Sequence, residues 1–121
     1  MRIAVCENSV ADADRMRAWL WQYCALYQLP AAIERFLSPE AFAARGERFD
    51  TVYIGFGGAA GFLQARRLRE RDPACRIVLV DDTQEFTIQC VRIHCTDFIL
   101  RPVEFRHIVR SMRLVTKDGV R

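Results

Sequence analysis

The first residues whose spacing could support chemistry lie in a glycine-rich loop. A strand-like run leads into the loop Gly55–Gly61, in which Gly55, Gly57 and Ala60 match a dinucleotide-binding fingerprint. Backbone amides of such a loop can bind a pyrophosphate, and an acid ending the next strand, here Asp81, can bind a ribose. The fingerprint normally follows the first strand of a sheet, whereas here it follows the third, and the sequence offers no second nucleotide-binding half. We therefore prefer the interpretation that small residues simply fill the loop, and a small-ligand (nucleotide-like) binding module is the alternative.

Soft metal ligands gather in one short stretch that contains Cys90, His94 and Cys95. Three ligands so close together form a cramped set, and the sequence has no second ligand pair to complete a tetrahedral site. The chain has 5 cysteines, an odd number, without a C-x-x-C pair. We therefore expect free thiols in a reducing compartment and no metal site.

Arginine dominates the basic residues: it accounts for all but one of the 18, and the net charge is +3. The arginines form two clusters, at Arg66, Arg67, Arg69 and Arg71 and at Arg101, Arg106, Arg110 and Arg113. A nucleic-acid interface is an alternative interpretation, but it usually requires a more basic domain. Because Glu70 and Glu104 lie among the arginines, we interpret both clusters as solvated helix faces.

The length and composition place further bounds on the protein. A chain of 121 residues fits one domain, and a hydrophobic content of 51% argues against disorder. No apolar run reaches the ~18 residues that cross a bilayer, so we expect no membrane segment. The amino terminus becomes polar too soon for a signal peptide, and a cytoplasmic location is expected.

Strands and helices are predicted to alternate along the whole chain. Short apolar runs predict strands at 3–6, 32–36, 51–54, 77–80 and 97–100. Helical spacing of apolar residues, and a Ser-Pro helix start at residue 38, predict helices at 16–27, 38–45, 62–71 and 84–93, with a fifth marked by Phe105, Ile108, Val109 and Met112.

This alternation predicts a parallel sheet with right-handed crossovers. Five such units predict an α/β flavodoxin-like, doubly wound fold with a five-stranded sheet in the order 2-1-3-4-5. Functional residues of this fold gather at the carboxyl ends of the strands. Those ends carry Glu7, Asn8, Gly55, Asp81 and Arg101.

Four segments together resemble a bacterial response-regulator receiver domain, particularly that of LytTR-type regulators. The resemblance covers residues 1–113 and is carried by the segments 2–7, 49–54, 65–70 and 94–103. The last segment, His-Cys-Thr-Asp-Phe-Ile-Leu-Arg-Pro-Val, is similar to the family ending His-Ala-x-Asp-Tyr-Leu-x-Lys-Pro. All four segments occur in the family's order and at its intervals, which makes the resemblance specific.

The resemblance implies which residues once performed phosphoryl transfer. In the family, two acids after strand one hold Mg²⁺, an aspartate ends strand three as the phosphoacceptor, a Ser or Thr follows strand four, and a lysine follows strand five. The matching positions here hold Glu7 and Asn8, Gly55, Asp81, and Arg101. We therefore expect a degenerate pseudo-receiver with no catalytic residue, no cofactor, and Mg²⁺ binding that is lost or weak.

Arg101 leads to a further expectation about this pocket. A guanidinium can bind two carboxylates in a geometry that lysine cannot reproduce. We expect Arg101 to bond both Glu7 and Asp81, which would hold the domain in one conformation that is insensitive to phosphoryl donors.

The resemblance also implies a partner surface made of helix four, strand five and helix five. Phe98, Arg106 and Arg110 are the candidate contact residues on it, for a protein partner or a homodimer. The implied function is protein–protein interaction in signalling and transcription regulation. Trp21 lies off the apolar stripe of its helix, and an exposed tryptophan suggests another contact.

The tail at 114–121 alternates apolar and polar residues and contains an Asp-Gly turn signal at 118–119. This pattern predicts a strand and a turn rather than a helix. LytTR-type regulators continue into a DNA-binding domain that opens with such a strand, so the chain would be the receiver part of a longer protein. DNA contact would then occur only through that further domain, and a frayed terminus is the alternative.

Overall fold

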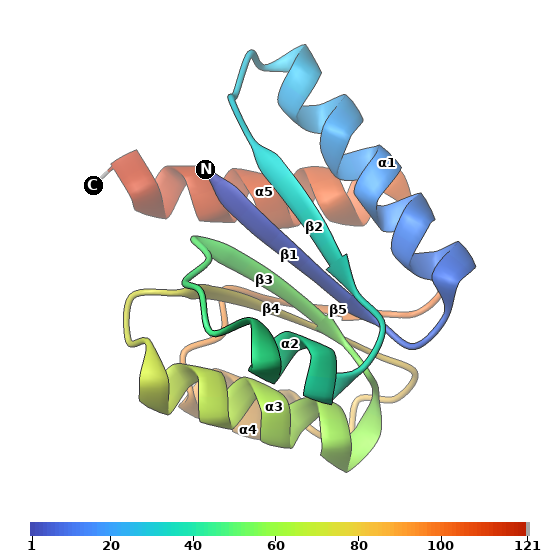
Figure 1. Ribbon diagram of the computed structural model, residues 1–121, viewed down its shortest axis with the longest axis vertical. Coiled ribbons are helices and arrows are strands. Elements are labelled where there is room, and N and C mark those ends of the chain that lie inside the picture. Colours follow the sequence, from blue (N-terminus) through green and yellow to red (C-terminus); the bar gives the residue numbers. More distant parts are fainter. Residues whose placement is uncertain (121) are drawn as a thin grey trace.

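The structure, a computed structural model, describes residues 1–120, with side chains through Thr116. Five parallel strands form one sheet in the order β2-β1-β3-β4-β5, which confirms the predicted fold (Figure 1). The strands are β1 (Arg2–Glu7), β2 (Ala32–Phe36), β3 (Thr51–Gly55), β4 (Arg76–Asp81) and β5 (Asp97–Leu100). The helices are α1 (Val10–Leu26), α2 (Pro39–Arg45), α3 (Gly58–Arg71), α4 (Thr87–Arg92) and α5 (Phe105–Val120).

Helices cover both faces of the sheet, with α1 and α5 on one face and α2, α3 and α4 on the other (Figure 1). Successive residues of a strand point to opposite faces, so each central strand supplies both layers of the core. Tyr53 and Val80 pack in the layer under α1 and α5, whereas Ile54 and Leu79 pack in the layer under the other three helices.

Capping residues define where the first two helices begin. Ser9 precedes α1, and its side chain accepts the backbone N–H of Asp12. Ser38 caps α2 in the same way, and Gly46 ends that helix in the left-handed region at φ 68°. The predicted start and end of α2 are thereby confirmed.

Two predicted helices have different bounds in the structure. Helix α3 begins at Gly58 rather than at residue 62, because the carboxylate of Asp81 accepts the backbone N–H of Gly58 and caps the first turn. Helix α4 is shorter than predicted. The residues before it form turns, and Phe86 stacks on Phe62 with ring centroids 5.4 Å apart.

The prediction of a strand and turn from residue 114 is wrong, because α5 continues to Val120. Val115 is buried one helical turn beyond Met112, so the apolar face of the helix extends past the predicted boundary at residue 113. The hydroxyl of Thr116 donates to the carbonyl of Met112, as expected within a helix. Arg121 lies outside the described residues, and a following DNA-binding domain stays a prediction.

The register of the sheet brings the predicted site residues to one edge. Glu7 pairs with Gly55 across β1 and β3, and Asp81 pairs with Leu100 across β4 and β5. Arg101 follows β5 directly, so four predicted positions lie at neighbouring carboxyl ends. Over residues 1–120, no helix is both long and apolar enough to cross a membrane.

Candidate functional site

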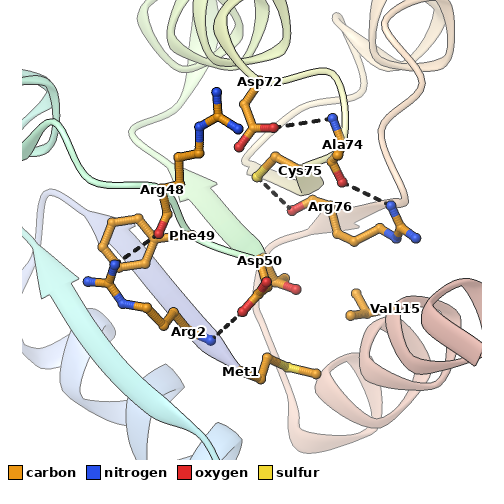
Figure 2. Close-up of a pocket in the computed structure, with 11 residues that line it drawn as sticks. Met1, Arg2, Arg48, Phe49, Asp50, Asp72, Ala74, Cys75, Arg76 and Val115 are labelled. Carbon is orange, nitrogen blue, oxygen red and sulfur yellow. Dashed lines mark hydrogen bonds between the residues drawn. The ribbon is translucent and has the colours of Figure 1, made fainter.

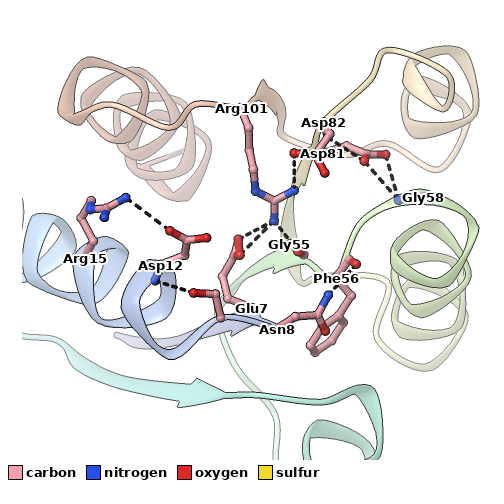
Figure 3. Close-up of polar contacts among 11 residues, drawn as sticks. Glu7, Asn8, Asp12, Arg15, Gly55, Phe56, Gly58, Asp81, Asp82 and Arg101 are labelled. Atoms are coloured by element: carbon pink, nitrogen blue, oxygen red, sulfur yellow. Dashed lines mark hydrogen bonds and ion pairs between the residues drawn. The ribbon is translucent and has the colours of Figure 1, made fainter.

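The site at the carboxyl edge centres on an ion pair between Arg101 and Glu7 (Figure 3). Arg101 Nη2 lies 2.8 Å from Glu7 Oε1 and 2.9 Å from Oε2, and it also donates to the carbonyl of Gly55. The Glu7 residue is 1% exposed, and the Arg101 side chain is 21% exposed. The guanidinium is therefore satisfied inside the protein, as we predicted for its contact with Glu7.

Arg101 lies beside Asp81, and its backbone N–H donates to the Asp81 carbonyl at 2.8 Å, but the predicted bond between the guanidinium and the Asp81 carboxylate is wrong, because the adjacent Asp82 makes it. Arg101 Nη1 lies 3.4 Å from Asp82 Oδ1, and the Asp82 side chain is 72% exposed. Asp81 instead accepts the backbone N–H groups of Gly58 at 3.1 Å and of Asp82 at 2.7 Å. The alternation of the strand explains the difference, because it directs Asp81 toward α3 rather than toward the layer that contains Arg101.

Gly55 leaves room for the Glu7 carboxylate. A Cβ atom at this position would overlap Glu7 Oε1, and it would lie 2.6 Å from Glu7 Cδ and 2.9 Å from Arg101 Nη2. Real Cβ atoms essentially never approach other heavy atoms so closely. The carboxylate of Glu7 thus occupies the space that a side chain on residue 55 would need.

Asn8 has a structural contact beside the pair. Its side-chain Nδ2 donates to the carbonyl of Phe56 at 2.9 Å, which ties the end of β1 to the loop after β3 (Figure 3). This bond holds the residue that follows Gly55 against the end of β1.

Burial and pairing act in opposite directions on the two charges. Burial raises the pKa of Glu7, and the charge and hydrogen bonds of Arg101 offset this only in part. Burial lowers the pKa of Arg101, but its bonds to Glu7 and Asp82 outweigh that effect and leave the pKa raised. The guanidinium therefore remains charged, while the carboxylate depends on it for compensation.

The residues considered as metal ligands are poorly suited to bind one. All 5 cysteines are free thiols. The hydrogen bond of the Cys95 thiol with Cys90, together with burial, raises the pKa of Cys95 and disfavours the thiolate form that metals bind. In the part of the chain that the structure describes, no group of three or more His, Cys, Asp or Glu is placed to hold a metal ion.

The glycine-rich loop has its first helical amide already occupied. Gly57 and Gly58 adopt φ of 84° and 58°, a conformation that side chains rarely accept. Both carboxylate oxygens of Asp81 lie near Gly58 N, at 3.1 and 3.2 Å. A pyrophosphate would have to displace this acid, so the geometry does not favour the dinucleotide alternative.

The three candidate contact residues form one neighbourhood at β5 and α5. Arg110 Nε binds Asp97 Oδ2 at 3.0 Å, and its Nη2 donates to the carbonyl of Phe98 at 3.0 Å. Phe98 is partly buried against the core, whereas the Arg106 side chain is 73% exposed. Arg106 is consequently the most exposed of the three candidates, and its Nη2 donates to Glu104 Oε1 at 3.0 Å.

Arg69 has a role that the sequence did not reveal. It donates to five backbone carbonyls around the ends of α3 and α4, those of Asp72, Pro73, Cys75, Ile93 and His94. The arginine cluster on α3 was interpreted as a solvated face, and Arg69 is an exception to that interpretation. Its place in the last turn of α3, where helix carbonyls lack partners within the helix, is the clue that the sequence offered.

A separate hollow of about 660 Å³ lies at the opposite, amino-terminal edge of the sheet (Figure 2). Its polar groups bond to each other across strands. Arg2 N lies 2.6 Å from Asp50 Oδ2, and Arg2 Nη1 lies 3.0 Å from the carbonyl of Arg48. We interpret these contacts as ties between strand ends rather than as a ligand site.

No protein-family model and no curated protein sequence matches this chain. Solved structures do match it. The response regulatory domain of protein mrkE from Klebsiella pneumoniae has a TM-score of 0.81 at 15% identity, covering 98% of this chain and 97% of that one. A CheY-like response regulator receiver domain protein from Methanospirillum hungatei has a TM-score of 0.76 at 14% identity, covering 99% and 98%.

A longer protein matches over part of its length. The response regulator DrrB from Thermotoga maritima, an OmpR/PhoB homologue, has a TM-score of 0.73 at 19% identity, covering 97% of this chain and 53% of that one. These neighbours share the fold of response-regulator receiver domains with this chain. At such low identities the likeness concerns the fold alone.

Proposed function

We propose that this chain is a receiver domain that no longer accepts a phosphoryl group and that acts through protein–protein contact. One observation carries the proposal: the Glu7 carboxylate fills the space beside Gly55 and binds Arg101 there. In the resembling family, an aspartate at the position of Gly55 is the nucleophile. This chain has an internal ion pair in its place.

The chemistry of phosphoryl transfer supports the proposal. Such transfer depends on positioning and on neutralising charge with a metal and a cation. Glycine supplies no nucleophile, and both carboxylate oxygens of Glu7 already accept hydrogen bonds from Arg101. Asp81 places a negative group near the approach of a phosphoryl donor, at a position where the family has a hydroxyl. We therefore propose no cofactor and weak or absent Mg²⁺ binding.

A permanently engaged Arg101 would remove the switch and leave one signalling state. The surface for a protein partner would then be the face formed by α4, β5 and α5, with Phe98, Arg106 and Arg110 as contact residues. The positive charge of the exposed Arg106 guanidinium suits an acidic partner, and arginine is common among the residues that contribute most to binding at interfaces. In a LytTR-type regulator, this face would act in transcription regulation, and DNA would be bound only by a further domain.

Intact-mass measurement after incubation with acetyl phosphate and Mg²⁺ tests the proposal. We expect an unmodified mass, while a receiver domain with its aspartate intact, treated in the same way, serves as the positive control. A phosphoryl adduct on this protein would falsify the proposed loss of phosphotransfer.

A further inference from the structure

Two cysteines, Cys90 and Cys95, occupy the contact positions of a Schellman motif that ends α4. The backbone N–H of Cys95 donates to the carbonyl of Cys90 at 3.0 Å, and that of His94 donates to the carbonyl of Val91 at 3.0 Å. His94 follows the C-cap residue Ile93 and adopts the left-handed conformation, at φ 59°. These two nested bonds define the motif, in which the side chains of the first and last residues meet.

The motif holds the two sulfur atoms beside each other. Because Cys95 N and Cys90 O are 3.0 Å apart, ordinary bond lengths limit the distance between the two Cα atoms to at most about 7 Å. The two thiols hydrogen-bond to each other, and Cys95 packs against the core cluster that contains Cys90. Bridging two cysteines requires backbone movement only beyond ~7 Å, so a disulfide can form here within the existing fold.

A reagent in solution can reach only one member of the pair directly. Cys90 is 2% exposed, whereas Cys95 is partly exposed and lines a hollow of about 610 Å³. The charged groups along this hollow are Arg69 and Arg76, together with the titratable His94, and among the described residues no Asp or Glu lines it. The local field therefore favours an anionic reagent over a cationic one.

We propose that Cys90 and Cys95 are a modification site, at which exchange with a small anionic disulfide such as glutathione disulfide forms a reversible intramolecular disulfide. The Cys95 thiolate attacks one sulfur of the reagent, and the departing thiolate takes up the proton that Cys95 lost. Cys90 then loses its proton and attacks the Cys95 sulfur, which forms the internal bond and releases the second thiol. Two protein thiols are thereby oxidised, and the reagent is reduced to two thiols.

The surroundings of Cys95 set the rate of this exchange. The hydrogen bond with Cys90 and burial raise the pKa of Cys95, and the charge of Arg69 opposes them only in part. Since the thiolate is the attacking form, we expect slow exchange at neutral pH and a rate that rises about tenfold for each unit of pH.

The disulfide would act at the junction of two elements of the proposed partner face. Cys90 lies in α4, and β5 begins at Asp97, two residues after Cys95. A bond between the two sulfurs would restrain this junction, so oxidation could alter how the face meets a partner. The modification itself does not depend on the proposed function.

Intact-mass measurement of the folded wild type after incubation with glutathione disulfide tests the proposal. We expect the loss of two hydrogen atoms, which dithiothreitol reverses. Trypsin cleaves after Arg92, between the two cysteines, so a non-reducing digest should contain the peptides 77–92 and 93–106 joined to each other.

Two serine variants separate the roles of the thiols. Cys90→Ser removes the second attacking thiol, and its reaction should stop with one glutathione attached to Cys95. Cys24→Ser is the matched control, because Cys24 is a buried cysteine outside the motif, and it should form the disulfide as fast as the wild type. Circular dichroism checks that both variants keep the helical content of the wild type. Cystamine, a cationic disulfide, should react more slowly than glutathione disulfide at low ionic strength.

Four results would overturn the inference. A wild type that keeps all its hydrogens from neutral to alkaline pH would mean that the two thiols act only as small apolar side chains. A digest that joins Cys95 to Cys75, which also lines the hollow, would move the bond elsewhere. A Cys90→Ser protein that still loses two hydrogens would exclude Cys90, and faster reaction with cystamine would contradict the choice of an anionic reagent.

Discussion

Replacing Gly55 with alanine should disrupt the centre of the site, although alanine is usually the better residue in a strand. Gly→Ala at an unstrained position stabilises a protein by about 0.4–1 kcal/mol. Here the added Cβ would lie 2.6 Å from Glu7 Cδ and 2.9 Å from Arg101 Nη2. The Glu7 carboxylate must therefore move away from Arg101 for alanine to fit.

The cost follows from the contacts that this movement breaks. Arg101 Nη2 donates to both oxygens of Glu7, and hydrogen bonds to charged groups contribute about 1.5–3 kcal/mol each. Arg101 keeps its contacts with Asp82 and with the carbonyl of residue 55, so part of this energy is retained. We expect Gly55→Ala to lower the free energy of unfolding by about 2–4 kcal/mol, which corresponds to a fall in Tm of roughly 8–16 °C for a domain of this size.

A double-mutant cycle shows whether Glu7 is the cause. In a Glu7→Ala background the obstructing carboxylate is gone, and Gly55→Ala should be neutral or stabilising by up to about 1 kcal/mol. Gly61→Ala is a matched control, because its Cβ would meet nothing closer than 3.7 Å. It should stabilise α3 by up to about 1 kcal/mol.

Urea unfolding followed by far-UV circular dichroism measures all these variants. The reasoning would be refuted by a Gly55→Ala protein as stable as the wild type. An equal cost of Gly55→Ala with and without Glu7 would refute it too, because the clash would then not involve the ion pair.

Two further predictions concern α5 and its contact with the sheet. His107 Nδ1 accepts the backbone N–H of Glu104 at 2.9 Å, and burial together with two neighbouring arginines lowers the pKa of His107. The imidazole of His107 then binds a proton more readily in the unfolded chain than in the folded protein, so the free energy of unfolding should fall as the pH drops below the ordinary histidine pKa. His107→Gln should lose this pH dependence in thermal unfolding, and equal pH profiles for the wild type and the variant would contradict the prediction. The hydroxyls of Tyr53 and Ser111 lie 2.6 Å apart in the core, and Ser111 also donates to Ile108. Ser111→Ala leaves the buried Tyr53 hydroxyl without its partner, and it should lower the free energy of unfolding in urea by about 1–3 kcal/mol, more than Tyr53→Phe does. A larger loss for Tyr53→Phe would contradict the prediction.

The fold could be predicted from the sequence because its signals are local and repeated. Aliphatic runs at 77–80 and 97–100, and the Ser38 cap of α2, lie where the sequence predicted them. The prediction for the tail was wrong because its alternation and its Asp-Gly pair are also local signals, and the burial of Val115 on the inner face of α5 outweighs them. A tertiary contact of this kind leaves no trace in a short window of sequence.

The site was predicted in part for a similar reason. Neighbouring strand ends are enough to place Arg101 beside Glu7, and the structure shows that contact. Which of two adjacent acids reaches Arg101 depends on the direction of each side chain at the end of β4. The Asp81 carboxylate accepts the backbone N–H of Gly58, and the Asp82 carboxylate pairs with the guanidinium of Arg101. Strand periodicity could have suggested this, if the last residue of β4 had been assigned to its face.

Amide and arginine side-chain NMR during Mg²⁺ titration, with and without acetyl phosphate, tests most directly whether the pocket is held closed by its own ion pair. We expect the signals of Glu7, Gly55 and Arg101 to shift no more in Mg²⁺ than they do in potassium chloride of the same ionic strength. Saturable shifts of these signals at low millimolar Mg²⁺, or further shifts on adding acetyl phosphate, would contradict it. Such shifts would mean that Glu7 leaves Arg101 for a metal and that the pocket retains a switch.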